Sequence, residues 1–387
     1  MDYDVIIVGA GPAGSAAAIP LATAGWKVLL LDSSAFPREK PCGDAITPDG
    51  VRILEEIGVL PEIDAEAYVS ITKLLVTSPD GTKVEMAVEP TNSGHRFIVA
   101  EREKFDLLLL KKAMQLGAEF RQARVTEVMK DSNDVSGVMV QSGGKMTTLS
   151  AKYIVGADGS TSAVRRSVMN TRPPRHSVAI RAYLQPFHCY SNTAEFHFIN
   201  EVFPGYAWIF PLGPDRANVG LGLDLEDYTK KGNHLKAALS GFLHRQDICE
   251  RYSEGTKLVS SKAWSYWFTA VEPGINAFPG VLLTGDAAGF MDPLTGEGIR
   301  NALLSGKLAG ETLATALQKM WSAELTSATY ASKCDADIIP ILNRSLALRK
   351  RFLKSPASFN RWLLLLRGMY PLTKPILNSI SNNFRFL

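Results

Sequence analysis

Cysteine is scarce in this chain of 387 residues, which contains only Cys42, Cys189, Cys249 and Cys334, all far apart in sequence. Zinc sites and disulfide frameworks need cysteines at short, paired spacings, so we expect neither. The six histidines also lack the spacing of metal ligands, and no metal ion is predicted. Without disulfides we expect a reducing compartment, the cytoplasm.

The sequence has no stretch that fits a signal peptide or a membrane span. Residues 5–26 carry no charge, but Asp2 and Asp4 stand where a signal peptide would be basic, and glycines and prolines interrupt the apolar run. Repeats and low-complexity tracts are also missing. A composition of 46% hydrophobic and 21% charged residues fits a globular protein with two or three packed regions.

Acidic residues are absent from residues 341–387, which contain nine Lys or Arg and follow a body with 33 basic and 39 acidic residues. This tail includes RWLLLLRGMY (361–370), which is too short to span a bilayer. Two interpretations stay open. The tail binds an anionic membrane surface, with Trp362 and Tyr370 at headgroup depth, or it is a helical region that packs its leucines on the body.

The first motif present is DVIIVGAGPAGSAAAIPLATAGWKVLLLD (4–32), which predicts a strand, a tight turn, a helix and a second strand. The glycines follow the G-x-G-x-x-G spacing that permits the turn, the approach of a pyrophosphate and the packing of the helix. Free N–H groups at the helix start face the phosphates, and an acid at the end of the second strand binds ribose. The residues concerned are Gly9, Gly11, Ala13, Gly14 and Asp32.

Two later segments repeat the pattern of an apolar strand followed by glycines, an acid and a helix. They are YIVGADGSTSAVRR (153–166), with Asp158, and GVLLTGDAAGFMDPLTGEGIRNALLSGKLAG (280–310), with Asp286. With the first motif they resemble the three fingerprints of flavoproteins related to para-hydroxybenzoate hydroxylase. The resemblance implies an FAD-binding α/β fold with Asp158 and Asp286 at the cofactor.

The same resemblance implies roles for other segments. A helix that starts at Gly298 and Ile299 would point at the flavin, where its N-terminus favours negative charge on the reduced ring. Residues 99–120 predict an amphipathic helix opened by Arg102, which would contact FAD, and Val125 would meet the adenine through its backbone. The alternative for Arg102 is a solvated residue in a first turn.

Cys42 lies in the loop KPCGDA (40–45), ahead of a helix that Thr47 and Pro48 predict as N-cap and first residue. In the flavin fold this loop passes beside the ring, which places Cys42, Gly43 and Ala45 at the cofactor. We expect Cys42 either to donate a proton there or to be a small residue that lets the backbone approach the flavin.

Three segments together, KPCG, PGYAWIFP (204–211) and GDAAGFMDPLTGEGI (285–299), resemble the geranylgeranyl reductase family over most of residues 1–310. That family uses FAD to reduce C=C bonds in isoprenoid chains. The resemblance implies a hydrophobic isoprenoid substrate and NAD(P)H or ferredoxin as the electron donor. A membrane-dissolved substrate would suit peripheral docking on the cytoplasmic face of the membrane. We expect no nucleic-acid partner.

The expected fold is a Rossmann-type FAD-binding domain with an antiparallel sheet that forms a substrate domain and a helical C-terminal region. The predicted boundaries are 1–70, 96–175 and 275–330 for the first domain, 71–95 and 176–274 for the second, and 331–387 for the last. Tyr206, Trp208 and Phe210 alternate on a strand and share one face. We expect Tyr206 and Trp208 to face the substrate; the alternative is that they belong to an ordinary hydrophobic core of the sheet.

Other flavin chemistries remain alternatives. Aromatic hydroxylases commonly have histidine after GDAA, where this chain has Gly289, and tend towards GQG, where it has Glu297 between two glycines. Halogenases share part of GYAWIFP but need a lysine that the sequence does not place. A flavin-binding protein without catalysis is the last alternative. Reductase chemistry fits the motifs best.

Overall fold

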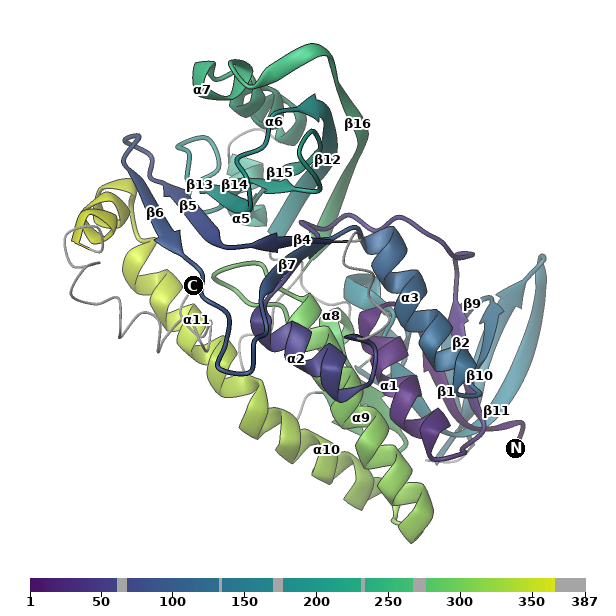
Figure 1. Ribbon diagram of the computed structural model, residues 1–387. Coiled ribbons are helices and arrows are strands. Elements are labelled where there is room, and N and C mark those ends of the chain that lie inside the picture. The colour runs from purple at the N-terminus through teal and green to yellow at the C-terminus, as the bar shows by residue number, and fades with distance from the viewer. Residues whose placement is uncertain (61–67, 132–133, 170–176, 231–233, 267–275, 366–387) are drawn as a thin grey trace.

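The computed structural model of the chain describes residues 1–60, 68–131, 134–169, 177–230, 234–266 and 276–365. These residues form a sheet whose central strands are parallel and which is packed with helices, and a second, mostly antiparallel sheet (Figure 1). Helices make up most of the described chain from Ile299 onwards. The α/β class predicted from the sequence is confirmed.

The first sheet contains the strands of the three glycine motifs. Its order is β17–β18–β11–β1–β2–β8, and β10 and β9 extend from β11 as antiparallel neighbours. The central strands are almost continuously apolar and buried because the sheet is covered on its faces. The bounds are β1 (Tyr3–Val8), β2 (Val28–Asp32), β8 (Glu119–Gln122), β9 (Arg124–Asp131), β10 (Asp134–Ser142), β11 (Lys145–Gly156), β17 (Ala277–Phe278) and β18 (Val281–Leu283).

Helices α1 (Pro12–Thr23) and α9 (Ile299–Lys319) pack unusually closely. A Cβ atom added at Gly306 would lie 2.1 Å from the Ala13 carbonyl oxygen, and one at Gly310 would lie 2.3 Å from that of Ala17. Only glycine permits this approach, which sets the two helices against each other. The other helices of this region are α2 (Pro48–Glu56), α3 (Arg102–Gln115), α4 (Ala163–Met169) and α8 (Gly285–Ala288).

The second sheet has the order β16–β12–β15–β14–β13–β5–β6. Its pairs are antiparallel except β13 with β5, a parallel pair between strands from distant parts of the chain. Parallel neighbours need such a long connection, because a hairpin joins only antiparallel strands. Helix α6 covers one face, and the other face looks towards the first sheet. The bounds are β5 (Lys73–Thr77), β6 (Lys83–Ala87), β12 (Ser177–Phe187), β13 (Thr193–His197), β14 (Tyr206–Pro211), β15 (Ala217–Asp224), β16 (Tyr252–Tyr266), α5 (Leu225–Lys230), α6 (Leu235–Leu243) and α7 (Gln246–Cys249).

A small third sheet ties the Cys42 loop to the start of α3. Strand β3 (Ala45–Ile46) pairs with β7 (Phe97–Ala100), which also pairs with β4 (Tyr68–Ile71). The Ala100 N–H donates to the Asp44 carbonyl oxygen at 2.8 Å. Residues about 60 positions apart in sequence, the Cys42 loop and Arg102, are therefore brought together.

The C-terminal helices run from the first sheet to the edge of the second sheet near β6 (Figure 1). They are α10 (Ala323–Asp337), α11 (Ile339–Phe352) and a further helical segment at 356–365. In the part of the chain that the structure describes, no helix combines the length and apolar character needed to cross a bilayer.

Candidate functional site

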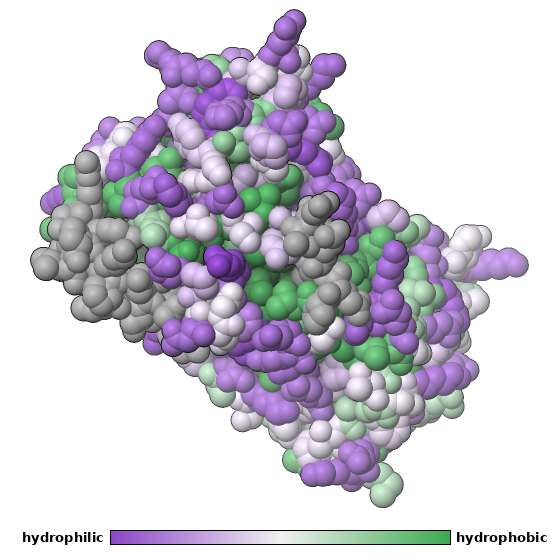
Figure 2. Space-filling view, in the orientation of Figure 1, coloured by the Kyte–Doolittle hydropathy of each residue, from purple (hydrophilic) through white to green (hydrophobic). Residues whose placement is uncertain are grey.

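A cavity of about 890 Å³ lies between the two large sheets and is closed on one side by the C-terminal helices. Figure 2 shows hydrophobic surface gathered in the middle of this face of the molecule, with hydrophilic residues around it. Gly14 does not line the cavity; every other residue predicted for the site does. These are Gly9, Gly11, Ala13, Asp32, Cys42, Gly43, Ala45, Arg102, Val125, Asp158, Tyr206, Trp208, Asp286, Gly298 and Ile299.

The glycines of the first motif have three different surroundings. Gly9 has a positive φ of 100°, and an added Cβ would lie 2.2 Å from the Ala157 carbonyl oxygen. At Gly14 an added Cβ would lie 1.8 Å from the Gly9 carbonyl oxygen, so the helix presses on the strand there. At Gly11 it would lie 3.3 Å from the end of the Arg38 side chain and 3.9 Å from Asp106 Oδ2, and it would meet no backbone atom within 4 Å. Gly11 is thus the position where the backbone is open to a ligand.

The acids at this end of the cavity are held by the chain itself. Asp32 accepts hydrogen bonds from the backbone N–H groups of Ala10 at 3.0 Å and Ser34 at 2.9 Å. Asp158 accepts from the Ala163 N–H at 2.6 Å and the Ser162 hydroxyl at 2.5 Å, which caps α4. Burial raises the pKa of Asp158, and these hydrogen bonds oppose the rise. A cofactor contact for either acid stays a prediction.

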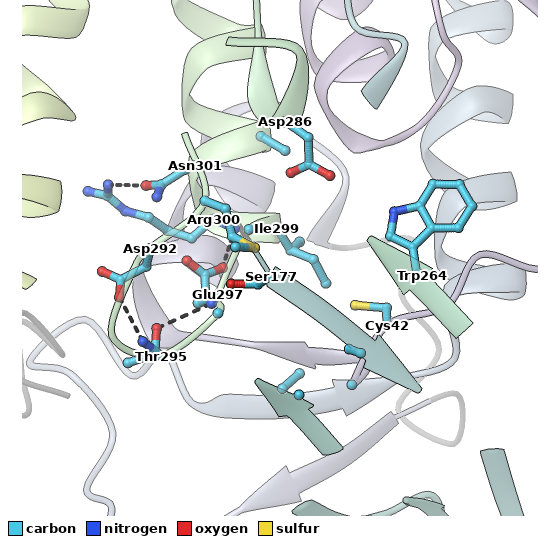
Figure 3. A pocket seen from close by; sticks show the side chains of 18 of the residues that line it. Cys42, Ser177, Trp264, Asp286, Asp292, Thr295, Glu297, Ile299, Arg300 and Asn301 are labelled. Carbon is cyan, nitrogen blue, oxygen red and sulfur yellow. Dashed lines mark hydrogen bonds between the residues drawn. The ribbon is translucent and has the colours of Figure 1, made fainter. Parts of the chain in front are cut away.

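The start of α9 meets Asp286 at the middle of the cavity. A Cβ added at Gly298 would lie 3.4 Å from Asp286 Oδ1, and Lys40 Nζ lies 3.6 Å from Asp286 Oδ2. Glu297 Oε1 accepts the Arg300 N–H at 2.6 Å in the first turn of the helix. In Figure 3 the side chains of Cys42, Asp286 and Glu297 lie around the same space.

Cys42 and Arg102 form the next part of the wall. Arg102 is only 4% exposed and pairs with Asp106 through two hydrogen bonds of 2.7 Å. It is therefore not the solvated arginine that was the alternative. Burial raises the pKa of the Cys42 thiol, although the Arg102 guanidinium favours the thiolate. Cys42 thus holds a proton at neutral pH.

The aromatic strand β14 forms the opposite wall. Trp208 and Phe210 belong to the cluster on the cavity side, whereas Ala207 and Ile209 pack under α6, which confirms the alternation predicted from the sequence. The Trp208 Nε1–H donates to Asn218 Oδ1 at 2.9 Å, and the Tyr206 hydroxyl donates to the Thr295 carbonyl oxygen. The aromatic rings are thereby fixed in orientation.

Beyond this wall the cavity continues as an apolar limb. Its lining comes from β5, from β6 and β13 with the residues that follow them, from the first residue of β7, and from the C-terminal helices: Leu74, Val76, Met86, Val88, Phe97, Phe196, Phe198, Phe352, Leu353, Phe359, Trp362 and Leu363. Trp362 packs on Phe352 and Phe359, with ring centroids 4.8 and 5.7 Å apart. The described part of the tail therefore closes the limb, while Tyr370 lies outside the described residues.

Several lining residues with polar or aromatic side chains were not predicted for the site, among them Arg38, Trp264 and Glu297. Trp264 comes from β16, which the sequence places in the covering sheet without indicating which side chain faces inward. Glu297 lies in the motif GDAAGFMDPLTGEGI (285–299), directly before the helix start that was predicted to face the flavin. A carboxylate at that position was the signal that could have identified it. Burial raises its pKa to about 7, with Asp292 and Asp49 adding to the rise and Arg300 opposing it.

The residues present fit FAD. Gly11 offers an open backbone at the start of α1, and within the described residues no side chain caps that helix. Such an N-terminus binds phosphate. From there one continuous cavity reaches Val125 on one side, and Asp286 and the start of α9 on the other. Gly11 and Ala13 would hold the pyrophosphate, Asp32 the ribose, and Asp286 with Gly298 and Ile299 the ribityl chain and ring.

Comparisons with known proteins agree with this geometry. Residues 2–197 match the family described as FAD binding domain, and residues 177–261 match the geranylgeranyl reductase catalytic domain. The chain is 32% identical over 352 residues to digeranylgeranylglycerophospholipid reductase 1 of Methanopyrus kandleri, covering 86% of this chain and 85% of that protein.

Solved structures show the same fold. A geranylgeranyl bacteriochlorophyll reductase-like protein from Thermoplasma acidophilum superimposes with a TM-score of 0.79 at 22% identity, covering 90% of this chain and 87% of that one. The myxobacterial chondrochloren halogenase CndH gives 0.72 at 23% identity, covering 85% and 78%. These two similarities concern the fold alone.

Proposed function

Because the chain belongs to the geranylgeranyl reductase family of FAD-dependent oxidoreductases, we propose that it hydrogenates C=C bonds in a geranylgeranyl-type chain carried by a lipid, quinone or pigment. The observation that carries this proposal is the apolar limb that leads away from Cys42 and the aromatic strand. A limb lined by leucine, valine, methionine and aromatic side chains suits a polyprenyl chain. It offers few partners to a small polar substrate.

The chemistry divides between the cofactor and the wall of the cavity. When bound, reduced FAD supplies a hydride to one alkene carbon. The Cys42 thiol supplies the proton to the other carbon and is left as a thiolate, to be reprotonated from solvent. Trp208, Tyr206 and Phe210 exclude water from the electron-deficient carbon, which water would otherwise trap. The electron donor that reduces the flavin is NAD(P)H or ferredoxin.

The test is anaerobic turnover with FAD reduced by dithionite and a geranylgeranylated lipid as substrate. Mass spectrometry should show the gain of one H₂ for each double bond reduced. Cys42→Ala and Cys42→Ser should retain FAD and lose turnover, whereas Cys249→Ser, on the outer helix α7, should behave like the wild type. Full turnover in both Cys42 variants would reduce Cys42 to a packing residue. Oxygen uptake with a hydroxylated or halogenated product, and no saturation, would replace the reductase by an oxygenase or a halogenase.

We also propose that the tail docks the enzyme on anionic membranes, where such a substrate is dissolved. In the described part of the tail, Lys350, Arg351, Lys354 and Arg361 are exposed. Leu364 and Leu365 are 48% and 64% exposed, while Leu363 beside them is buried against the body. One side of this segment thus closes the cavity and the other presents cations and leucines, which suits an interfacial helix.

A further inference from the structure

Asp44 lies directly behind the cavity wall and takes no part in the chemistry described above. It is 0% exposed, does not line the cavity, and has a positive φ of 65°. Asp44 Oδ2 accepts the Asn218 amide at 2.7 Å and the Tyr183 hydroxyl at 3.2 Å. Among the described residues, nothing donates to Oδ1. A buried carboxyl with one unpartnered oxygen is costly, which calls for a functional explanation.

The Asn218 amide joins the two walls of the cavity. Its Nδ2 donates to the Cys42 carbonyl oxygen at 2.7 Å as well as to Asp44, and its Oδ1 accepts the indole N–H of Trp208 at 2.9 Å. A Cβ atom at Gly43 would lie 2.9 Å from the Phe210 ring, so the loop also touches the aromatic strand directly. The Cys42 loop is therefore fastened to β14 through one amide that Asp44 orients.

The charged and hydrogen-bonding groups that face Asp44 come from three elements. Arg102 stands at the start of α3, and Arg181 and Tyr183 on β12; Asn218 on β15 is the neutral partner. Arg181 is itself paired with Glu39 at 2.6 Å. At Cys42, Arg102 and the backbone N–H of Asp44 favour the thiolate, whereas burial and the charge of Asp44 favour the thiol.

We propose that Asp44 is a positioning residue for Cys42, which fastens the Cys42 loop to Trp208 through Asn218 and, by its negative charge, keeps the Cys42 thiol protonated. The proposal deepens the proposed function, because that thiol proton is the one delivered to the alkene. Burial raises the pKa of Asp44 to about 7, so Asp44 is ionised over the alkaline range in which a thiol titrates. Removing its charge should therefore make the thiolate easier to form.

Asp44→Asn is a closely matched variant. The amide can present its oxygen to Asn218 and Tyr183 and place its nitrogen where Oδ1 has no donor, and asparagine tolerates a positive φ. The readout is the ultraviolet absorbance of the Cys42 thiolate, measured against pH in the FAD-bound protein. To isolate this one thiolate, the absorbance of the same protein carrying Cys42→Ser is subtracted from that of the wild type and from that of Asp44→Asn. We expect the titration midpoint to fall by about one pH unit in Asp44→Asn.

The control is the Cys249 thiolate, obtained in the same way with Cys249→Ser, whose midpoint should not move. If Asp44→Asn fails to retain FAD, Asp44→Gly also removes the charge and suits the positive φ, and its midpoint should fall too. An unchanged or higher Cys42 midpoint overturns the proposal. The titration needs no substrate, so a shifted midpoint in an enzyme that reduces no lipid would overturn the proposed function and leave this inference standing.

Discussion

The two ends of the cavity are built in different ways. The end that would hold the nucleotide comes largely from one continuous unit, β1, α1 and β2, which spans residues 3–32 and carries its own glycines and acid. The apolar end takes its lining from β5, β6, β13, β14 and the C-terminal helices, which come from separate parts of residues 73–363. One end is local in sequence and the other is assembled by the tertiary fold.

Because of this difference, we expect the two ends to tolerate substitutions to different degrees. At the nucleotide end main chain packs tightly around two of the glycines, so a methyl group added at Gly9 or Gly14 meets backbone atoms that cannot move. At the apolar end side chains form the surface, and neighbouring side chains can adjust. We therefore expect substitutions at the first end to remove the cofactor, and substitutions at the second to change turnover and stability while the flavin stays bound.

The largest effect should come from Gly14→Ala, whose Cβ would lie 1.8 Å from the Gly9 carbonyl oxygen. We expect loss of bound FAD and a free energy of unfolding lower by about 3 kcal/mol, measured by flavin absorbance and urea denaturation. Gly11→Ala should fold normally, because its Cβ would meet only side-chain atoms of Arg38 and Asp106, at 3.3 and 3.9 Å. It should nevertheless bind FAD about tenfold more weakly, or by about 1.4 kcal/mol.

The control for both is Gly241→Ala in α6, where an added Cβ has no neighbour within 4 Å. It should bind FAD like the wild type. If Gly11→Ala also bound FAD normally, the pyrophosphate would not approach the backbone at Gly11, and the assignment of this end of the cavity would fail.

Trp208→Phe probes the apolar end. The phenyl ring cannot donate to Asn218 Oδ1, and a buried acceptor without its partner costs about 1–3 kcal/mol. We expect that loss in the free energy of unfolding, slower turnover, and FAD content equal to the wild type. Trp26→Phe, outside the cavity lining, should retain wild-type turnover. Loss of FAD in Trp208→Phe would contradict the division between the two ends.

Glu297, between the two ends, should make stability depend on pH. Its pKa is raised to about 7 in the folded protein from 4.5, so the folded state binds more protons than the unfolded state between these values. The free energy of unfolding should therefore fall as pH rises from about 5 to 7. Glu297→Gln keeps the hydrogen bond to the Arg300 N–H and should flatten this decline in denaturation curves taken at several pH values.

Glu311→Gln is the matched control on the same helix, with a side chain that is 42% exposed, and should leave the decline unchanged. A decline that is equally steep in the wild type and in Glu297→Gln would contradict the raised pKa of Glu297.

The smallest effect should be at the outer surface of the tail. Replacing Leu364 and Leu365 by serine should weaken flotation with anionic vesicles several-fold at low salt and leave FAD content unchanged. Leu325 on α10 is matched in exposure, at 49% against 48% for Leu364, so Leu325→Ser should float like the wild type. Wild-type protein that ignores anionic vesicles at low salt would make the tail a structural element that closes the cavity.

Much of the nucleotide end could be predicted from the sequence. Strand, turn, helix and strand follow one another within 30 residues, and the glycine spacing reflects contacts between near neighbours, such as Gly14 with Gly9. The three motifs also predicted Asp158, Asp286 and the start of α9, because the carboxyl ends of parallel strands meet at one edge of a sheet. The alternation on β14 was predictable for the same local reason, the two-residue period of a strand.

Only the tertiary structure decided which side chains meet across the cavity. Asn218 lies 176 positions from Cys42 and joins it to Trp208, and nothing in the local pattern of β15 distinguishes this asparagine. Arg102 was predicted beside the flavin, and its ion pair with Asp106 is local, four residues further along α3, but its burial depends on the segments that pack around it. Trp362 turned inward because Phe352 and Phe359 offer it a packing surface. Local backbone preferences act over a few residues, so the sequence by itself determined the glycine motifs and their turns. Burial and hydrogen bonding between distant segments determined which side chains form the wall of the cavity.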